Sequence, residues 1–192
     1  DYQLRVLAAL EEGYRKVLWI VHRRAGKDIT ALNYVIREMS TNVGVYYYVF
    51  PTYSQAKKVI WDSIRNDGFR ILDHFPKEEV ASMNSQEMKV RFHNGSLFQL
   101  VGSDNFDSLM GTNPTGVVFS EYALQDPRAY EFMRPILTAN KGWALFISTP
   151  RGKNHLWDLY NIAKNNPTDW WYEILTIKDT GIISAEEIEK DR

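Results

Sequence analysis

The stretch from Lys16 to Thr30, KVLWIVHRRAGKDIT, constrains the fold of this 192-residue chain more than any other. An apolar run typical of a strand, Val17 to Val21, is followed by a basic loop and then by helical spacing from Asp28. Backbone N–H groups in such a loop, and the positive end of the helix dipole, attract an anion. The order of strand, Gly26-Lys27 and helix therefore indicates a nucleotide phosphate-binding loop, in which Lys27 would reach the β- and γ-phosphates.

The loop departs from the strict pattern G-x-x-x-x-G-K-[ST] at two positions. Val21 stands where the first Gly belongs, and Asp28 stands where Ser or Thr belongs. An ordinary turn is the competing interpretation of a lone Gly-Lys pair after a strand, and the loop taken alone favours that turn. The interpretation as a phosphate loop therefore depends on residues further along the chain.

Length and composition indicate one globular domain with room for a small appendage and no membrane span. The chain is 44% hydrophobic and 24% charged, and its formal net charge is -1, so any nucleic-acid binding must be local or assembled from several subunits. The absence of cysteine excludes disulfides and thiolate metal sites. No apolar run has membrane-spanning length and no signal peptide is evident. We expect a soluble, intracellular domain that is a piece of a longer protein.

Hydrophobic spacing predicts alternating helices and strands, which is typical of an α/β fold. Helices are expected at 2–12, 28–38, 53–66, from 126–127 onward and 154–163, with a short charged helix after Ser184. Strands are expected at 17–21, 43–50, 117–120, 143–147 and 170–177. The segment from Met88 to Val101 reads as an added β-hairpin with Asn94-Gly95 as a type I′ turn.

Two of the expected strands end in polar residues. The run 117–120 ends at Glu121, and the run 143–147 ends at Ser148-Thr149-Pro150. In open α/β sheets, ligands bind at the carboxyl ends of the strands. Glu121 could orient the water that attacks a γ-phosphate, and the hydroxyls could bond that phosphate or the water. A chance Glu and an ordinary turn are the alternatives, so the weight comes from pairing Glu121 with Lys27.

Three further features each allow two interpretations. Gln3 could read an adenine edge with its amide, although a solvated surface Gln is at least as well favoured. The tyrosines of the run from Val43 to Phe50 are interpreted as core packing rather than a base-stacking platform, because their neighbours are apolar. Lys57 and Lys58 make one helix side basic, which indicates a solvated face or a contact with a phosphate backbone.

Taken in order, these motifs resemble those of the ATPase domain of the large terminase subunit of tailed double-stranded DNA bacteriophages, over most of the chain. The shared motifs are Gln3, an Arg early in the phosphate loop (Arg23), the Pro-Thr-Tyr-x-Gln-Ala stretch Pro51 to Ala56, the Asn-Gly-Ser hairpin Asn94 to Ser96, the acidic segment Phe119 to Ala123, and the Ser-Thr-Pro coupling motif Ser148 to Gly152. Each motif is weak by itself, whereas their order is specific.

The resemblance implies a P-loop NTPase fold of the ASCE type, with three layers, a mostly parallel central sheet and an added β-hairpin. It implies a P-loop ATPase domain at 1–178, and at 179–192 the start of a linker toward a C-terminal nuclease domain that this chain does not contain. ATP and Mg2+ are the implied cofactors. The implied role is a homo-oligomeric ring, expected to be a pentamer, that drives double-stranded DNA into a procapsid in the host cytoplasm.

The implied partners are the portal protein, the procapsid and the small terminase subunit, with no membrane. Cleavage of DNA is not expected of this chain. Two alternatives stay open: a helicase-like nucleic-acid-remodelling ATPase, which would need a second motor domain, and an inactive P-loop module.

The resemblance also assigns roles to residues of this chain. The expected catalytic residues are Glu121, Lys27, Arg23 and Thr149. The expected nucleotide-binding residues are Gln3, His22, Arg23, Arg24, Ala25, Gly26, Lys27, Asp28 and Ile29. The expected metal ligands are Asp28, at the loop position called Walker A, and Ser120, on the acidic strand called Walker B. The equally favoured alternative is that Asp28 only caps its helix and that Ser120 has no role in the site.

Two departures from the family pattern shape the expected chemistry. The family has a hydroxyl on the loop and an acidic residue before the catalytic Glu, whereas here Asp28 and Ser120 exchange those two ligand types. Met110 stands where many relatives have an Arg that acts on a neighbour's ATP. We therefore expect Arg23 or Arg24 to contact the γ-phosphate in cis.

Overall fold

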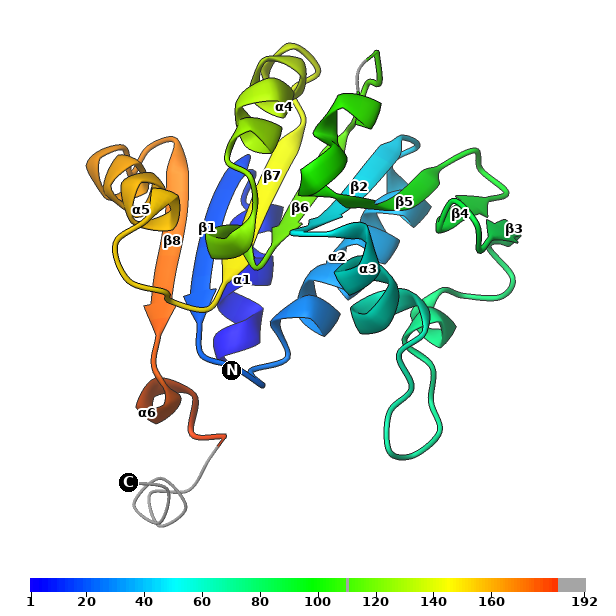
Figure 1. The fold of residues 1–192 in the computed structure, drawn as a ribbon, viewed down its shortest axis with the longest axis horizontal. Helices are drawn as coiled ribbons and strands as arrows, with labels where there is room; N and C mark the ends of the chain where they lie inside the picture. The colour runs from blue at the N-terminus through cyan, green and yellow to red at the C-terminus, as the bar shows by residue number, and fades with distance from the viewer. Residues whose placement is uncertain (110, 183–192) are drawn as a thin grey trace.

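The computed structural model describes residues 1–109 and 111–182, which build one sheet of eight strands in the order β3-β4-β5-β2-β6-β7-β1-β8 (Figure 1). The strands are β1 (Lys16–Val21), β2 (Val45–Phe50), β3 (Val80–Asn84), β4 (Lys89–Phe92), β5 (Leu97–Gly102), β6 (Gly116–Ser120), β7 (Trp143–Ser148) and β8 (Trp170–Leu175). Strands β5, β2, β6, β7, β1 and β8 pair in parallel, whereas β3–β4 and β4–β5 are antiparallel. The predicted mostly parallel α/β sheet is confirmed.

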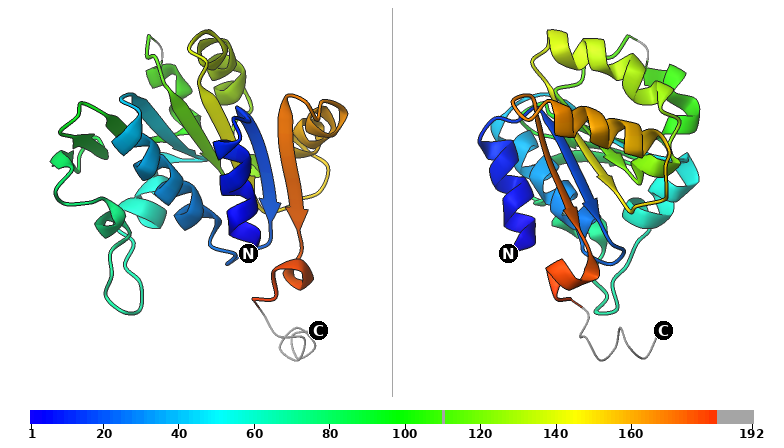
Figure 2. Two further views of the ribbon diagram at one scale, coloured as in Figure 1. Left: turned by 180° about the vertical axis from the view of Figure 1, so that it is seen from behind. Right: turned by 90° about the vertical axis from the view of Figure 1, so that its left-hand side faces the viewer.

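Helices cover both faces of the sheet, as the two views in Figure 2 show. The helices α1 (Tyr2–Glu11) and α2 (Lys27–Thr41) pack on one face, and α4 (Arg128–Ala139) and α5 (His155–Asn165) pack on the other. Side chains of β1 alternate between the two cores: Trp19 packs with α1 and α2, whereas Leu18 and Ile20 pack with α4 and α5. This alternation explains the nearly continuous apolar strands, and it confirms the expected three layers.

The added β-hairpin is present, but its turn differs from the prediction. Gly95 has φ +98°, whereas Asn94 is not left-handed, so the turn is not type I′. The Phe92 N–H donates to Ser96 O at 2.9 Å and the Gly95 N–H to Phe92 O at 3.0 Å, which makes a three-residue loop with Gly in the left-handed position. The Asn94 side chain donates to Met39 O and accepts from the Ser96 N–H, and these bonds fix it against α2. The sequence prediction also missed β3, which extends the hairpin to three antiparallel strands.

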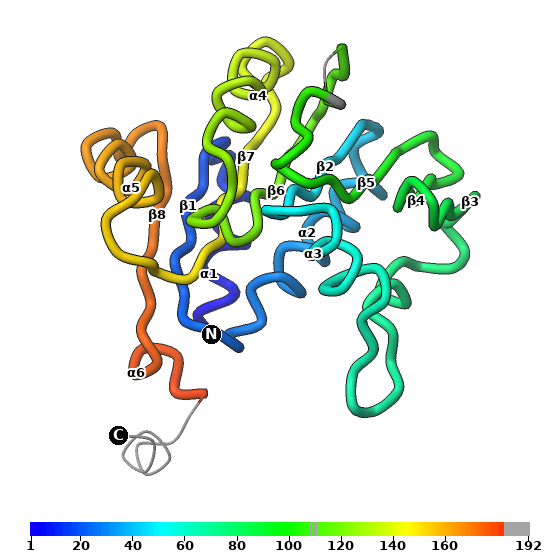
Figure 3. The backbone as a smooth tube through the Cα atoms, viewed as in Figure 1, coloured from blue at the N-terminus to red at the C-terminus, as the bar shows by residue number. Residues whose placement is uncertain are grey.

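The helix expected at 53–66 is shorter than predicted. The helix α3 (Tyr53–Ala56) continues as one π-helical turn, η1 (Lys57–Trp61), which buries the adjacent residues Ile60 and Trp61. In the predicted helix, Ile64 would point inward with Ile60 and Trp61, and this is wrong. Ile64 is 63% exposed and forms an isolated antiparallel bridge to Arg70. The residues between them include the turn-forming Asn-Asp-Gly at 66–68, so the chain loops outward there instead of continuing the helix (Figure 3).

Short elements complete the description. They are η2 (Ile71–His74), η3 (Ser103–Leu109), η4 (Tyr122–Leu124) and α6 (Ile177–Thr180). The strand expected to reach Ile177 ends at Leu175, because Asp179 accepts hydrogen bonds from the Thr176 N–H and hydroxyl at 2.7 Å and so starts α6. Likewise β2 begins at Val45, and Val43 is exposed.

Met110 and the helix expected after Ser184 lie outside the described residues. Within the described residues, no helix is long and apolar enough to span a membrane.

The close approach of β6 to β7 gives a prediction for stability. Gly116 pairs with Trp143, and a Cβ added at Gly116 would overlap the indole ring. Gly116→Ala should therefore lower the free energy of unfolding by about 1–3 kcal/mol through overpacking, measured by urea denaturation. Gly116→Ala combined with Trp143→Phe should lose less stability than the sum of the two single changes. Strictly additive losses would show that the ring is not what restricts this position.

Candidate active site

The loop between β1 and α2 presents a row of hydrogen-bond donors. Gly26 has φ +73°, which a Gly adopts without strain, and Lys27 begins the 15-residue helix α2. In the described part of the chain, the backbone N–H groups from Arg23 to Ile29 donate to no acceptor. These donors and the positive end of α2 form the kind of surface that binds phosphate groups.

Lys27 joins the carboxyl ends of three parallel strands. Its ammonium lies 2.8 Å from Glu121 Oε1 and donates to Thr149 Oγ1 at 3.2 Å. Thr149 in turn holds Glu121: its hydroxyl donates to Oε1 at 3.2 Å and its backbone N–H donates to Oε2 at 3.3 Å. The Lys27 side chain is 6% exposed and that of Glu121 27% exposed. The structure therefore brings together three of the four residues expected to be catalytic.

Two residues of the site hold a left-handed backbone that L-residues rarely adopt. Arg24 has φ +64° and Glu121 has φ +52°. Such a conformation typically costs about 1–3 kcal/mol in a residue other than Gly, and it is concentrated at functional sites. At Glu121 this backbone turn directly follows β6, and it places the carboxylate beside Lys27 rather than along the strand direction.

The two residues expected to bind metal also meet. The Ser120 hydroxyl donates to Asp28 Oδ1 at 2.6 Å, and the Tyr48 hydroxyl donates to the same oxygen at 3.0 Å. Burial raises the pKa of Asp28 above its ordinary value, against the opposing effects of the Ser120 hydrogen bond and the Lys27 charge. Burial also raises the pKa of Tyr48 well above its ordinary value, so the phenol stays a donor at neutral pH.

The N-terminal helix contacts the loop through its first turn. Gln3 Nε2 donates to Ala25 O at 3.1 Å, and the Tyr2 hydroxyl donates to the same carbonyl at 2.8 Å. A Cβ added at Gly26 would lie 2.8 Å from Gln3 Nε2, the end of a flexible side chain that can shift, so the left-handed φ is what requires the glycine. Gln3 is therefore not the freely solvated surface residue of the alternative interpretation.

The other expected nucleotide-binding residues lie around the same loop. His22 contacts Arg23 O through Nδ1 at 2.7 Å and the Thr180 hydroxyl through Nε2 at 2.6 Å, which links the loop to α6. Arg23 and Arg24 are exposed and form no ion pair within the described residues. Ile29 is half-buried against the core on the α2 side of the sheet.

Two polar residues that hold the site, Tyr48 and Gln125, were missed by the sequence prediction. Tyr48 was assigned to packing with its two neighbouring tyrosines, and all three are buried as predicted. Buried Gln125 donates through Nε2 to Val49 O at 2.8 Å and to Ser120 O at 2.7 Å. Ser148 Oγ accepts from the Ala123 N–H at 3.1 Å, which ties the end of β7 to the turn after β6. No local pattern marks Gln125, because its link to Val49 O joins it to a strand 76 residues away in the sequence.

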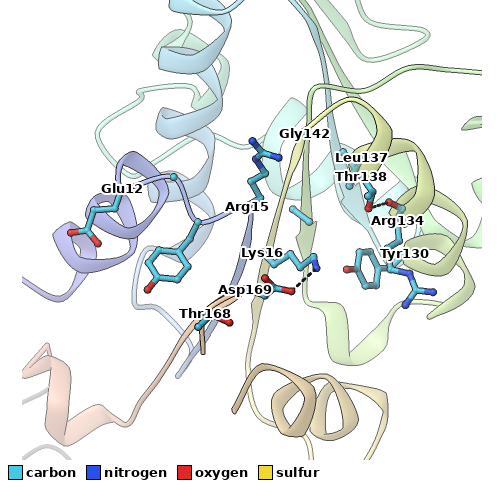
Figure 4. A pocket seen from close by; sticks show the side chains of 13 residues that line it. Glu12, Arg15, Lys16, Tyr130, Arg134, Leu137, Thr138, Gly142, Thr168 and Asp169 are labelled. Carbon is cyan, nitrogen blue, oxygen red and sulfur yellow. Dashed lines mark hydrogen bonds and ion pairs between the residues drawn. The ribbon is translucent and has the colours of Figure 1, made fainter. Parts of the chain in front are cut away.

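A cavity lies at the opposite end of the strands. Figure 4 shows this cavity, of about 520 Å³, between the start of β1 and α4, lined among others by Arg15, Lys16, Tyr130, Arg134 and Asp169. None of the residues expected at the active site lines it. The charged and hydroxyl side chains at the carboxyl ends of the strands, and not this cavity, therefore identify the candidate site.

The fold is the P-loop NTPase fold of the ASCE type, and comparisons with known proteins specify the likeness further. No protein-family model matches the chain. The large terminase subunit of Escherichia phage T5 is 30% identical over 196 aligned residues, which cover 99% of this chain and 43% of that protein. The large terminase subunit of Thermus virus P23-45 is 26% identical over 154 residues, covering 72% of this chain and 31% of that protein.

Solved structures show the same fold. A mutant of the large terminase ATPase domain of Thermus phage P74-26 has a TM-score of 0.78 at 19% identity, covering 97% of this chain and 86% of that chain. The large terminase of a thermophilic bacteriophage, solved with ATP-gamma-S, has a TM-score of 0.74 at 15% identity, covering 100% of this chain and 48% of that chain. The chain spans less than half the length of the curated relatives it matches. The resemblance to the ATPase domain of phage large terminase subunits is confirmed.

The role of Gln125 can be tested by its removal. Gln125→Leu would leave two buried carbonyl groups without their side-chain donor, so the free energy of unfolding should fall by about 1–3 kcal/mol. Gln55→Leu is the matched control, because Gln55 is exposed and surface changes of this kind stay within about 0.5 kcal/mol. Equal denaturation curves for the two variants would show that Gln125 does not hold the strand ends together.

Proposed function

We propose that this chain is the ATPase domain of a viral DNA-packaging motor and hydrolyses ATP with Mg2+. The observation that carries the proposal is the contact of Lys27 with Glu121 and Thr149, beside a loop whose N–H groups have no acceptor among the described residues. Relatives named as large terminase subunits, and the same fold in a terminase solved with ATP-gamma-S, support it. Loss of activity would remove the reason to keep the buried Lys27 between the Glu121 carboxylate and the Thr149 hydroxyl, so this contact favours an active ATPase over an inactive module.

The proposed roles follow from charge and geometry. The loop N–H groups and Lys27 hold the β- and γ-phosphates, and Lys27 neutralises charge that develops during phosphoryl transfer. Glu121 keeps two donors from Thr149 when Lys27 turns to the phosphates. Its carboxylate is thereby held in one orientation and can position the attacking water.

The residues at Asp28 and Ser120 fit a magnesium ion. Ordinary P-loop sites hold Mg2+ with a loop hydroxyl and a strand carboxylate. Here the loop supplies the carboxylate and the strand the hydroxyl, and the two groups are hydrogen-bonded at 2.6 Å. Both are oxygen ligands, and one carboxylate with phosphates and water suits Mg2+. The alternative that Asp28 merely caps its helix has no support, since its carboxylate accepts from Ser120 and Tyr48 and from no N–H of the first turn.

The remaining nucleotide contacts are proposed from position. Arg23 would contact the γ-phosphate in cis, because its side chain is exposed beside the loop and has no ion-pair partner among the described residues. Gln3, anchored to the loop through Nε2, keeps its carbonyl oxygen for the amino group of an adenine. Arg24, Ala25 and Ile29 would contribute their backbone N–H groups to phosphate binding, and His22, whose N–H donates to Leu175 O at 3.3 Å, would hold the start of the loop.

The role of the whole protein is proposed from its relatives. A motor of this kind would work as a ring, expected to be a pentamer, on a portal and procapsid in the host cytoplasm, with a small subunit that selects the DNA. A net charge of -1 indicates that one copy binds double-stranded DNA weakly, through local groups such as the exposed Lys57 and Lys58. The helicase-like alternative shares the site, and procapsid-dependent DNA translocation distinguishes the two functions.

The catalytic role of Glu121 is testable by isosteric substitution. Glu121→Gln keeps the hydrogen bond from Thr149 and removes the charge, so ATP should still bind while turnover falls by about 10²-fold or more. Phosphate release and nucleotide affinity are measured on the same preparation. Glu131→Gln, an exposed change on α4, is the control and should turn over ATP like the parent. Near-normal turnover in Glu121→Gln would remove this residue from the site.

The exchange of metal ligands makes a separate prediction. A double-mutant cycle compares Asp28→Thr, Ser120→Asp and the combined variant by Mg2+-dependent ATP turnover. Each single change leaves the metal with two hydroxyls or two carboxylates and should be harmful, whereas the pair restores the ordinary arrangement and should recover much of the loss. Losses of ATP turnover that are strictly additive in the double variant would contradict the exchange of metal ligands.

A further inference from the structure

The Asp28 carboxylate is held by two donors on a single oxygen. Ser120, at the end of β6, and Tyr48, in the middle of β2, both donate to Oδ1, at 2.6 and 3.0 Å. Within the described residues, Oδ2 accepts no hydrogen bond. We propose that Tyr48 is a positioning residue that fixes the Asp28 carboxylate so that Oδ2 is the oxygen offered to the metal. This inference rests on the proposed function and adds a residue that none of the motifs contains.

The hydroxyl of Tyr48 is not needed for packing. The ring is fully buried and contacts Phe50 at a centroid distance of 5.3 Å and Phe98 at 6.3 Å, contacts that a phenylalanine would also make. A buried hydroxyl costs free energy unless it is hydrogen-bonded, and the partners of this one both belong to Asp28, namely Oδ1 and, at 3.3 Å, the backbone carbonyl. The Tyr48 phenol therefore contacts Asp28 alone through its hydroxyl.

The neighbouring tyrosines show that this contact is specific to position 48. Tyr46 lies on the same face of β2 and is equally buried, but its hydroxyl donates to Asn42 O at 2.6 Å, at the far end of α2. Tyr47 points to the opposite face and packs in the other core. Of the three tyrosines, Tyr48 alone contacts the candidate metal site.

Two donors on different strands restrict the carboxylate more than one donor does. With Ser120 alone, Asp28 could rotate about its side-chain torsions and keep the bond, because the serine hydroxyl can follow it. The Tyr48 ring cannot follow, since it is enclosed by aromatic neighbours in the core. Groups that orient a metal-binding carboxylate in this way typically contribute about 10–100-fold to metal affinity or activity.

The test compares Tyr48→Phe with Tyr46→Phe, which removes a buried phenol hydrogen bond outside the site. ADP affinity is measured by calorimetry with and without Mg2+. The temperature of the measurement is kept well below the thermal unfolding midpoint of the less stable variant. In Tyr48→Phe, the gain in affinity that Mg2+ gives should fall by about tenfold relative to the parent, whereas affinity without metal should change by about twofold or less. Tyr46→Phe should keep the full gain from Mg2+.

The outcomes separate this proposal from the function on which it rests. If the parent binds ADP no better with Mg2+ than without, the proposed metal-dependent function is contradicted. If the parent shows the gain and Tyr48→Phe shows the same gain as Tyr46→Phe, the positioning role of Tyr48 is overturned and the function stands. Thermal unfolding of both variants checks that each is folded, and since each loses one hydrogen bond, similar midpoints are expected. Direct Mn2+ titration with ADP, followed by electron paramagnetic resonance, gives a second readout that does not depend on turnover.

Discussion

The buried ammonium of Lys27 is the constraint on which the site depends. A charge that is 6% exposed must be paired, and Glu121 and Thr149 provide its partners. They can do so because β1, β6 and β7 run in parallel and end together, with Ile20 opposite Ser148 and Ser120 opposite Ile147. The helices on both faces keep these strands in register, so the three-layer fold is what places one cation between two strand ends.

The same strand end, Ser120-Glu121, serves two clusters that lie side by side. Glu121 faces Lys27, whereas Ser120 faces Asp28, the next residue of the loop. Gln125 holds the Ser120 carbonyl, and the left-handed turn at Glu121 sends the two side chains to different partners. The Ser120 hydroxyl and the Asp28 carboxylate can therefore meet without a shift of either element, which brings the two proposed metal ligands together despite the departure from the usual loop pattern.

The sequence was sufficient for the layers, the parallel sheet and the meeting of Lys27, Glu121 and Thr149. Each of these residues follows an apolar strand, and this order is a local signal. It was insufficient where structure depends on tertiary contacts. The π-helical turn buries both Ile60 and Trp61, and Asn94 is tied to α2, so propensity alone predicted a helix too long and a turn of the wrong type. Tyr48 and Gln125 were missed for the same reason, since Tyr48 donates to Asp28, 20 residues away, and Gln125 donates to Val49 O, 76 residues away.

A crystal structure of the domain with ADP and Mg2+ tests the central claim most directly. The account predicts phosphates against the N–H groups of the loop from Arg23 to Asp28, and the metal at about 2.0–2.1 Å from an Asp28 oxygen, with Ser120 as a direct ligand or joined through one water. Nucleotide bound at the other end of the strands, beside Arg15 and Arg134, or a metal coordinated without Asp28, would contradict the account.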